Sequence, residues 1–226
     1  FFIEAAGFFT KAISLNPLHA RAYQRRGYDH RVQCRYELAV CDLTRAIEID
    51  PNYADAILSR GFTYLDTGQY EHAVGDMTRL AELDPSNRDA YSGRALAYMS
   101  LNRYEEAAGD YSKLIETEQG SSYWFRERAL ANARLGNRSS ALEDLAKAED
   151  LETGYWVYEN AGECYEILGD LPSAIESYSK AIASSPRPQS EYYKKRAEVF
   201  KKMGDGRRAE EDFDRAKQIK MFGRIL

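Results

Sequence analysis

Apolar residues recur at helical spacing along the whole chain, in short stretches separated by turn signals. Tyr91, Ala95 and Tyr98 lie at positions i, i+4 and i+7, and Tyr104 and Ala107 begin the same pattern after a short break. This spacing gathers apolar side chains on one face of an α-helix. Each stretch spans roughly 14 residues, a length at which an isolated helix is marginal in water. The pattern therefore predicts pairs of amphipathic helices that stabilise one another.

One alanine recurs at a nearly constant interval of 34 residues. Its positions are Ala5, Ala39, Ala73, Ala107, Ala141, Ala174 and Ala209. Pro17, Pro51 and Pro85 follow the same period, each closing a predicted second helix. A fixed period of this length is typical of stacked helical repeats. We predict full repeats over 20–53, 54–87, 88–121, 122–154, 155–189 and 190–226 (the last with a short tail), preceded by the second half of another over 1–19.

Two further columns keep the same register. A small residue recurs in the first predicted helix, as Gly27, Gly61, Ala95, Ala129, Gly162 and Ala197. A bulky residue recurs in the second, as Leu43, Met77, Tyr111, Leu145, Tyr178 and Phe213. These columns resemble those of the tetratricopeptide repeat over essentially the entire chain. The resemblance implies an all-α, right-handed superhelical solenoid of antiparallel helix hairpins, with thirteen helices.

The turn inside each repeat and the junctions between repeats carry their own signals. Glycine stands at the turn in four repeats, where a left-handed residue ends the first helix, while Cys34 and Asn102 stand there in two others. Gln119 and Thr153 replace the expected junction prolines, and the fourth and fifth repeats have 33 and 35 residues. We expect altered packing around 117–123 and 151–156.

Charge and composition argue against some classes of function and favour one cellular compartment. The formal net charge of −5 disfavours a general nucleic-acid binder, and no apolar run is long enough to span a membrane. Three cysteines at unrelated spacings, Cys34, Cys41 and Cys164, favour a reducing compartment, and hence the cytoplasm. The chain starts without methionine inside a helical pattern, so we expect an excerpt from a longer protein.

Catalytic and metal-binding motifs are missing from the sequence. It has no nucleophile elbow, no HExxH, no phosphate loop and no paired CxxC. His19, His30 and His72 each have a structural explanation, as a turn residue, an aromatic-column residue and a neighbour of the repeated alanine. We therefore expect no enzyme activity, no cofactor, no metal and no small-molecule substrate.

A charged pair recurs inside the repeats. Arginine precedes the small column and aspartate follows sixteen residues later, as Arg26 and Asp42, Arg60 and Asp76, Arg94 and Asp110, Arg128 and Asp144, and Arg196 and Asp212. The fifth repeat lacks both, with Ala161 and Ser177. In an antiparallel hairpin the two columns should face each other, so we predict bidentate, architectural ion pairs.

The resemblance also implies that first helices line a concave surface that binds peptides. Candidate groove residues are Arg25, Tyr28, Leu58, Phe62, Leu65, Leu96, Met99, Arg126, Leu130, Asn160 and Lys195. The apolar members either meet a partner or pack between adjacent first helices. Arg126, Asn160 and Lys195 fall on the columns of the family's carboxylate clamp. Glu191 brings the wrong charge to another clamp column, which disfavours that mode.

Charged zones flank this stripe. Arg21, Arg25 and Arg31 would favour acidic residues of a ligand at one end. Acidic residues in the fifth repeat would favour basic ones at the other end, and are Glu159, Glu163 and Glu166. The same acidic column argues against RNA binding, although aromatic residues are interleaved with basic ones in the first and last repeats.

Three functions follow from the sequence. The leading hypothesis is a protein-interaction scaffold that binds a peptide or protein segment in the concave groove. The alternative is a regulatory or targeting segment of a larger multidomain enzyme. A third reading is self-association through uncapped ends, since Phe1, Phe2 and the closing segment 221–226 would leave apolar surface exposed.

Overall fold

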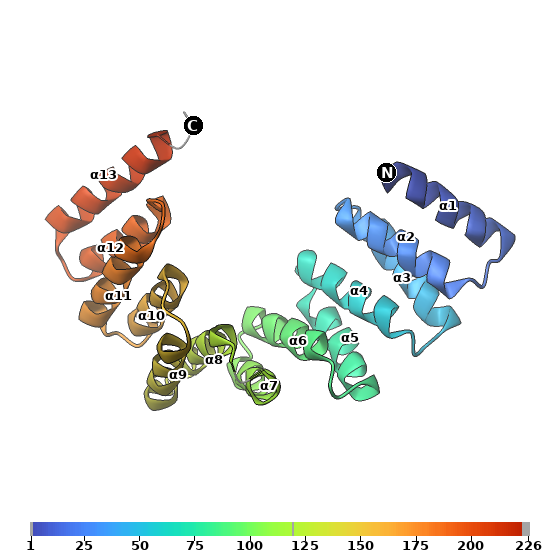
Figure 1. The fold of residues 1–226 in the computed structure, drawn as a ribbon, viewed down its shortest axis with the longest axis horizontal. Coiled ribbons are helices and arrows are strands. Elements are labelled where there is room, and N and C mark those ends of the chain that lie inside the picture. The colour runs from blue at the N-terminus through green and yellow to red at the C-terminus, as the bar shows by residue number, and fades with distance from the viewer. Residues whose placement is uncertain (1, 119, 223–226) are drawn as a thin grey trace. The chain divides into compact units, whose positions relative to one another are not determined.

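The chain is built from helices alone in the part that the structure describes. The structure is a computed structural model that describes the backbone of residues 2–118 and 120–222 and the side chains of 7–118 and 120–221. The helices are α1 (Phe2–Leu15), α2 (Ala20–Val32), α3 (Tyr36–Ile49), α4 (Ala54–Asp66), α5 (Tyr70–Leu83), α6 (Arg88–Ser100), α7 (Tyr104–Thr117), α8 (Ser122–Arg134), α9 (Arg138–Leu151), α10 (Tyr155–Ile167), α11 (Leu171–Ser184), α12 (Ser190–Lys202) and α13 (Gly206–Phe222) (Figure 1). These thirteen helices, with no strand among the described residues, confirm the predicted all-α repeat fold.

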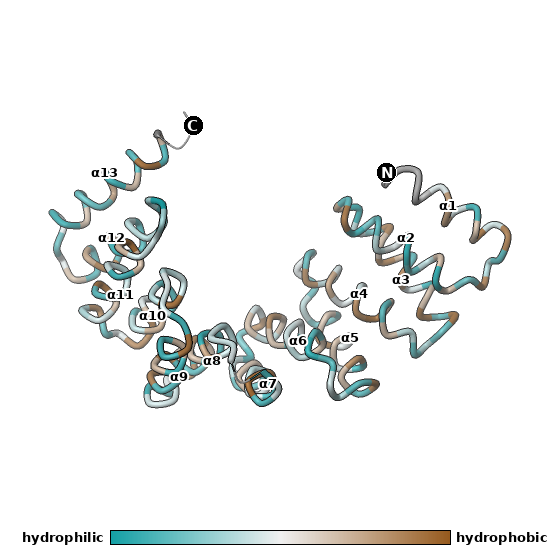
Figure 2. The backbone as a smooth tube through the Cα atoms, in the orientation of Figure 1, coloured by the Kyte–Doolittle hydropathy of each residue, from teal (hydrophilic) through white to brown (hydrophobic). Residues whose placement is uncertain are grey.

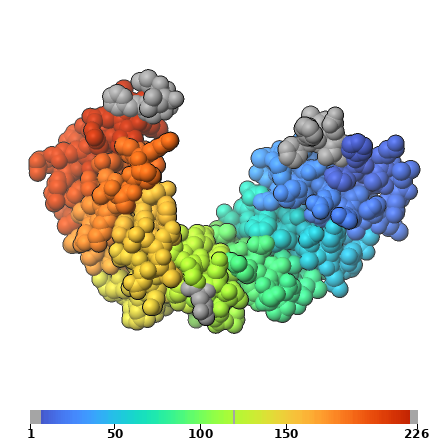
Figure 3. All heavy atoms as spheres, in the orientation of Figure 1, coloured from blue at the N-terminus to red at the C-terminus, as the bar shows by residue number. Residues whose placement is uncertain are grey.

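Packing divides the chain into an N-terminal part, Phe1–Leu114, and a C-terminal part, Ile115–Leu226. Within each part, successive segments of the chain lie against one another in the space-filling view (Figure 3). Hydrophobic and hydrophilic positions are interspersed along the helices (Figure 2). Each part is therefore a stack of helix pairs with its own core.

A left-handed residue ends the first helix of each full repeat. Gly68 has a φ of 72°, and Cys34 and Asn102 adopt φ values of 57° and 59° without being glycine. After this turn the N–H of Gln69 reaches back to the carbonyl of Tyr64 at 2.8 Å. This bond satisfies a carbonyl that the helix end leaves free, as in a Schellman motif. The expected conformation of the turn column is confirmed.

Small residues of the first helix allow the second helix to approach closely. A Cβ on Gly61 would lie 2.8 Å from Cε of Met77, and a Cβ on Gly162 would lie 2.6 Å from Cε1 of Tyr178. Both bulky partners are fully buried. Each hairpin is therefore closed by a large side chain that fills the space left by a small one.

The junction between the fourth and fifth repeats is built differently from those at α3–α4, α5–α6 and α11–α12. At these three junctions a first helix packs on the second helix of the preceding repeat, whereas α10 contacts α8 more than α9 in the preceding repeat. Ser122 donates to Glu152 at 2.5 Å, and Arg126 Nη1 donates to the carbonyl of Trp156 at 3.2 Å. The altered packing predicted for 151–156 is confirmed. The companion prediction for 117–123 centres on Gln119, which lies outside the described residues, as do Phe1 and 223–226.

Candidate protein-interaction surface

Five arginine–aspartate pairs lock the two helices of their repeats together. In the first, Nε and Nη2 of Arg26 donate to Oδ2 and Oδ1 of Asp42, both at 2.7 Å. The same bidentate geometry, with N–O distances of 2.6–2.9 Å, joins Arg60 to Asp76, Arg94 to Asp110, Arg128 to Asp144 and Arg196 to Asp212. Hydrogen bonding to the mostly buried carboxylate raises the pKa of Arg60. The structure thus brings together the two columns that the sequence placed face to face.

Four of these arginines, Arg26, Arg60, Arg94 and Arg196, also reach the preceding repeat, a contact that our sequence analysis missed. Nη1 of Arg60 donates to the hydroxyl of Thr44 on α3 at 3.1 Å. Equivalent bonds of 2.8–3.2 Å run from Arg26 to Thr10, from Arg94 to Thr78 and from Arg196 to Ser179. Where the fifth repeat has Ala161 instead of arginine, the hydroxyl position of the fourth repeat is Ala146. A hydroxyl column five residues after the repeated alanine was the available signal.

In the N-terminal part, α2, α4 and α6 lie side by side and form one surface, here called the first-helix face. Two of its apolar side chains remain open to water, Tyr28 and Leu96, each 43% exposed. The other predicted apolar groove residues of this part are half-buried, and are Leu58, Phe62, Leu65 and Met99.

The half-buried residues among the predicted groove residues include side chains that pack within the stack of helices, as the alternative interpretation states. Leu58 packs against the core cluster around Leu43. The guanidinium of Arg31 lies 5.3 Å from the ring centre of Phe62 and donates to Asp66 at 2.7 Å. Arg31 therefore already pairs with an acidic residue of its own chain, and its attraction of an acidic ligand residue stays a prediction. Among the predicted apolar groove residues of this part, Tyr28 and Leu96 are the exposed ones, while Leu58, Phe62, Leu65 and Met99 are half-buried.

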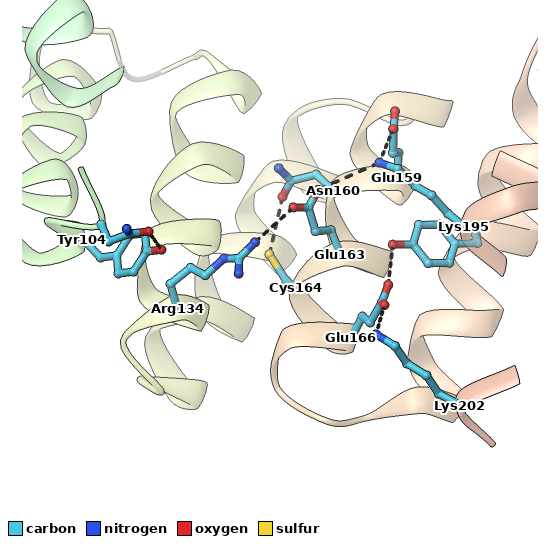
Figure 4. Close-up of polar contacts among 11 residues, drawn as sticks. Tyr104, Arg134, Glu159, Asn160, Glu163, Cys164, Glu166, Lys195 and Lys202 are labelled. Atoms are coloured by element: carbon cyan, nitrogen blue, oxygen red, sulfur yellow. Dashed lines mark hydrogen bonds and ion pairs between the residues drawn. The ribbon is translucent and has the colours of Figure 1, made fainter. Parts of the chain in front are cut away.

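In the C-terminal part, the residues on clamp columns are already bound to their own chain. Lys195 donates to Glu159 at 2.6 Å (Figure 4). Asn160 is buried and accepts from Sγ of Cys164 at 3.7 Å. Arg126 binds a backbone carbonyl of α10, and Leu130 packs against the core around Ala129. All four of these residues on clamp columns therefore make contacts within their own chain.

The acidic column of α10 is likewise neutralised from both sides. Arg134 of α8 lies 3.7 Å from Glu163, and Lys202 of α12 donates to Glu166 at 2.5 Å (Figure 4). The hydroxyl of Tyr178 also donates to Glu166, at 3.2 Å. Glu159 and Glu166 thus pair with lysines one repeat further along the stack, which the sequence of a single repeat does not indicate. That these glutamates attract basic ligand residues stays a prediction.

Burial shifts the pKa values of several ionisable groups in this region. Burial raises the pKa of the Cys164 thiol to about 12, so the reactive thiolate is scarce at neutral pH. Burial also raises the pKa of Glu127, to which nearby Glu163 contributes, while Arg126 lowers it. No group of three potential metal ligands occurs among the described residues.

The stacked hairpins, the left-handed turns and the small-against-bulky columns define a helical-repeat protein. The tetratricopeptide repeat family model matches residues 58–123 and 126–188, more than half of the chain. The chain belongs to the tetratricopeptide repeat family. A comparison with curated protein sequences gives no significant match.

Solved structures share this fold. A tetratricopeptide repeat protein from Parabacteroides merdae has a TM-score of 0.79 at 22% identity, over 96% of this chain and 86% of that one. YrrB, described as a tetratricopeptide repeat protein with an unusual peptide-binding site, has a TM-score of 0.66 at 22% identity, over 79% of this chain and 92% of its own. MamA has a TM-score of 0.66 at 21% identity, over 73% and 91%. None of the helices in the described ranges is both long and apolar enough to cross a bilayer.

Proposed function

We propose that this chain is a protein-interaction scaffold that binds a peptide or protein segment on the first-helix face of its N-terminal part, without catalysis of its own. The observation that carries the proposal is the exposure of Tyr28 on α2 and of Leu96 on α6, the two first helices that lie on either side of α4. The column of Tyr28 and Leu96 also holds Phe62, so apolar residues recur where a polar residue would suffice for water. YrrB, which shares the fold, is described as having a peptide-binding site.

The chemistry of the face suits an apolar anchor with acidic flanking residues. Arg21 and Arg25 are exposed on α2, on the same helix as Tyr28. A ligand would gain roughly 1.5–3 kcal/mol for each large apolar side chain that it covers completely. Two such anchors supply about 3–6 kcal/mol, which is less than the roughly 8 kcal/mol of micromolar binding, so further contacts on the same face must contribute. The arginines would act mainly on the association rate.

Affinity capture with the full chain tests this function. Partners retained by the wild-type chain are identified by mass spectrometry, and capture is repeated with Tyr28→Ala and Leu96→Ala. The matched control is Leu83→Ala, an equally exposed leucine (40%) at the end of a second helix, α5. We expect both first-helix variants to lose the partner and the control to keep it. Equal retention by all three folded variants would place the interaction on another surface.

A further inference from the structure

The row of apolar residues on the first-helix face is open at both ends and covered in the middle. Tyr28, Phe62 and Leu96 hold the same position on α2, α4 and α6, since they follow one another at intervals of 34 residues. Tyr28 and Leu96 are each 43% exposed, whereas Phe62 is half-buried. The guanidinium of Arg31 lies 5.3 Å from the centre of the Phe62 ring. A ligand therefore meets two apolar contact points with a guanidinium between them.

The distance between these two contact points limits the conformation of a ligand. Packed helices lie about 8–10 Å apart, so Tyr28 on α2 and Leu96 on α6, with α4 between them, lie roughly 16–20 Å apart. Six residues of an extended chain span about 19–20 Å, at roughly 3.1–3.4 Å per residue. Residues i and i+6 also point to the same side of the chain, both in a β-strand and in polyproline II. Two apolar side chains six residues apart can therefore reach both points.

Arg31 offers hydrogen-bond donors to the part of a ligand that crosses between the two contact points. Its Nε donates to Oδ2 of Asp66 at 2.7 Å, which holds the guanidinium in place. Nη1 and Nη2 make no hydrogen bond to any residue in the described ranges, and the side chain is 25% exposed. An extended backbone has carbonyls free to accept from these nitrogens, whereas an α-helix uses its carbonyls internally. The observations therefore favour an extended segment over a helix.

We propose that the ligand of the first-helix face is an extended protein segment with large apolar side chains at positions i and i+6, an inference that rests on the proposed function. One of these side chains covers Tyr28 and the other covers Leu96. A backbone carbonyl between them accepts from the terminal nitrogens of Arg31. Arg21 and Arg25 are exposed on the helix that carries Tyr28, so an acidic residue next to the anchor at Tyr28 sets the direction of the segment.

Selection from a peptide library tests both the site and the spacing. A phage-displayed library of random peptides of about 12 residues, long enough to cross three helices, is selected on the full chain. The clones are then tested against Tyr28→Ala and Leu96→Ala. Clones that lose binding to both variants are expected to carry an apolar pair six residues apart.

The outcome separates this inference from the proposed function. A selection in which no clone depends on Tyr28 and Leu96 overturns both together. Dependent clones with any other recurrent spacing overturn this inference alone. A spacing of about seven or eleven residues, as on one face of a helix, would show that the ligand is helical.

A synthetic peptide from a clone with the six-residue spacing measures how strictly the spacing is required. Fluorescence anisotropy compares it with two versions that have one residue deleted from, or inserted into, the stretch between the anchors. We expect each version to bind the wild type about tenfold more weakly or worse, because one anchor is turned away from the face. Equal affinity of all three peptides contradicts the extended conformation.

Arg31→Lys tests the hydrogen bonds to the ligand backbone. Lysine keeps the charge but not the planar set of donors, so we expect the peptide to bind this variant about fivefold more weakly. A peptide with an ethylene-glycol spacer of equal length between the anchors lacks the carbonyls, and should bind the variant and the wild type alike. Arg138→Lys is the matched control and should bind as the wild type does, because Arg138 also pairs with an aspartate of the next repeat, Asp170. An equal loss with both peptides would assign Arg31 a purely structural role and contradict its contact with the ligand.

Discussion

Arg60 holds Asp76 through two parallel hydrogen bonds of 2.8 and 2.7 Å, and its third nitrogen reaches Thr44 on the preceding repeat. The guanidinium therefore joins three helices, α3, α4 and α5. Both partners of the ion pair are largely removed from water. The planar guanidinium holds several donors in fixed positions and can make all three hydrogen bonds at once, which the ammonium group of a lysine would not reproduce.

Removing one partner of this pair should cost more stability than removing both. We expect Arg60→Ala to lower the free energy of unfolding by about 3 kcal/mol, because the carboxylate of Asp76 stays buried without its cation. Arg60→Ala with Asp76→Ser, which copies Ala161 and Ser177 of the fifth repeat, should cost less than Arg60→Ala alone, and hence less than the sum of the single changes. Urea denaturation measures all three variants. Arg215→Ala on α13 serves as an exposed control, and strict additivity would contradict the account.

The hydroxyl of Thr44 should contribute measurably to the junction between repeats. We expect Thr44→Val to cost about 1 kcal/mol, since it leaves a partly buried N–H of Arg60 without its acceptor. The matched control is Ala146→Thr, which restores the hydroxyl at the junction where Ala161 supplies no guanidinium. Thermal denaturation should show a lower midpoint for the first variant and little change for the second. An equal effect of both would argue against the contact.

Contacts within a repeat could be predicted from the sequence, whereas contacts between repeats could not. The sixteen-residue spacing of Arg26 and Asp42 places them opposite each other, because a short turn fixes the register of an antiparallel hairpin. The pairing of Glu159 with Lys195 depends on how α12 is placed relative to α10, which the sequence pattern of a single helix does not specify. For the same reason, the sequence pattern did not indicate that α10 packs only lightly on α9. Periodicity along one helix defines which face of that helix is buried, but it does not define which other helix packs against this face.

The left-handed turn predicts a stabilising substitution. Cys34 adopts a φ of 57°, a conformation that costs a residue with a side chain roughly 1–2 kcal/mol relative to glycine. Cys34→Gly should therefore raise the thermal midpoint. Asn102→Gly should raise it less, because asparagine tolerates this conformation better. A lower midpoint for Cys34→Gly would indicate that its contact with Tyr36 outweighs the backbone strain.

Glu127 predicts a pH-dependent stability. Burial raises its pKa above the ordinary value of 4.5, so the folded chain binds its proton more tightly than the unfolded chain does. Stability from this group falls as pH rises from 4.5 through the folded pKa, and the cost is complete above it. Glu127→Gln should therefore raise the thermal midpoint at pH 7, with a gain that shrinks towards pH 4.5. Glu198→Gln, at an exposed position of α12, is the control, and a pH-independent gain would contradict the assignment.

Calorimetric titration of the captured partner segment against the full chain tests the proposed function most directly. The comparison is wild type against Tyr28→Ala, Leu96→Ala and the exposed control Leu83→Ala, with folding checked by circular dichroism. Loss of a covered apolar anchor should weaken binding about tenfold to a hundredfold in each first-helix variant. The control should match the wild type. Unchanged dissociation constants for Tyr28→Ala and Leu96→Ala would contradict the claim that the first-helix face holds the ligand.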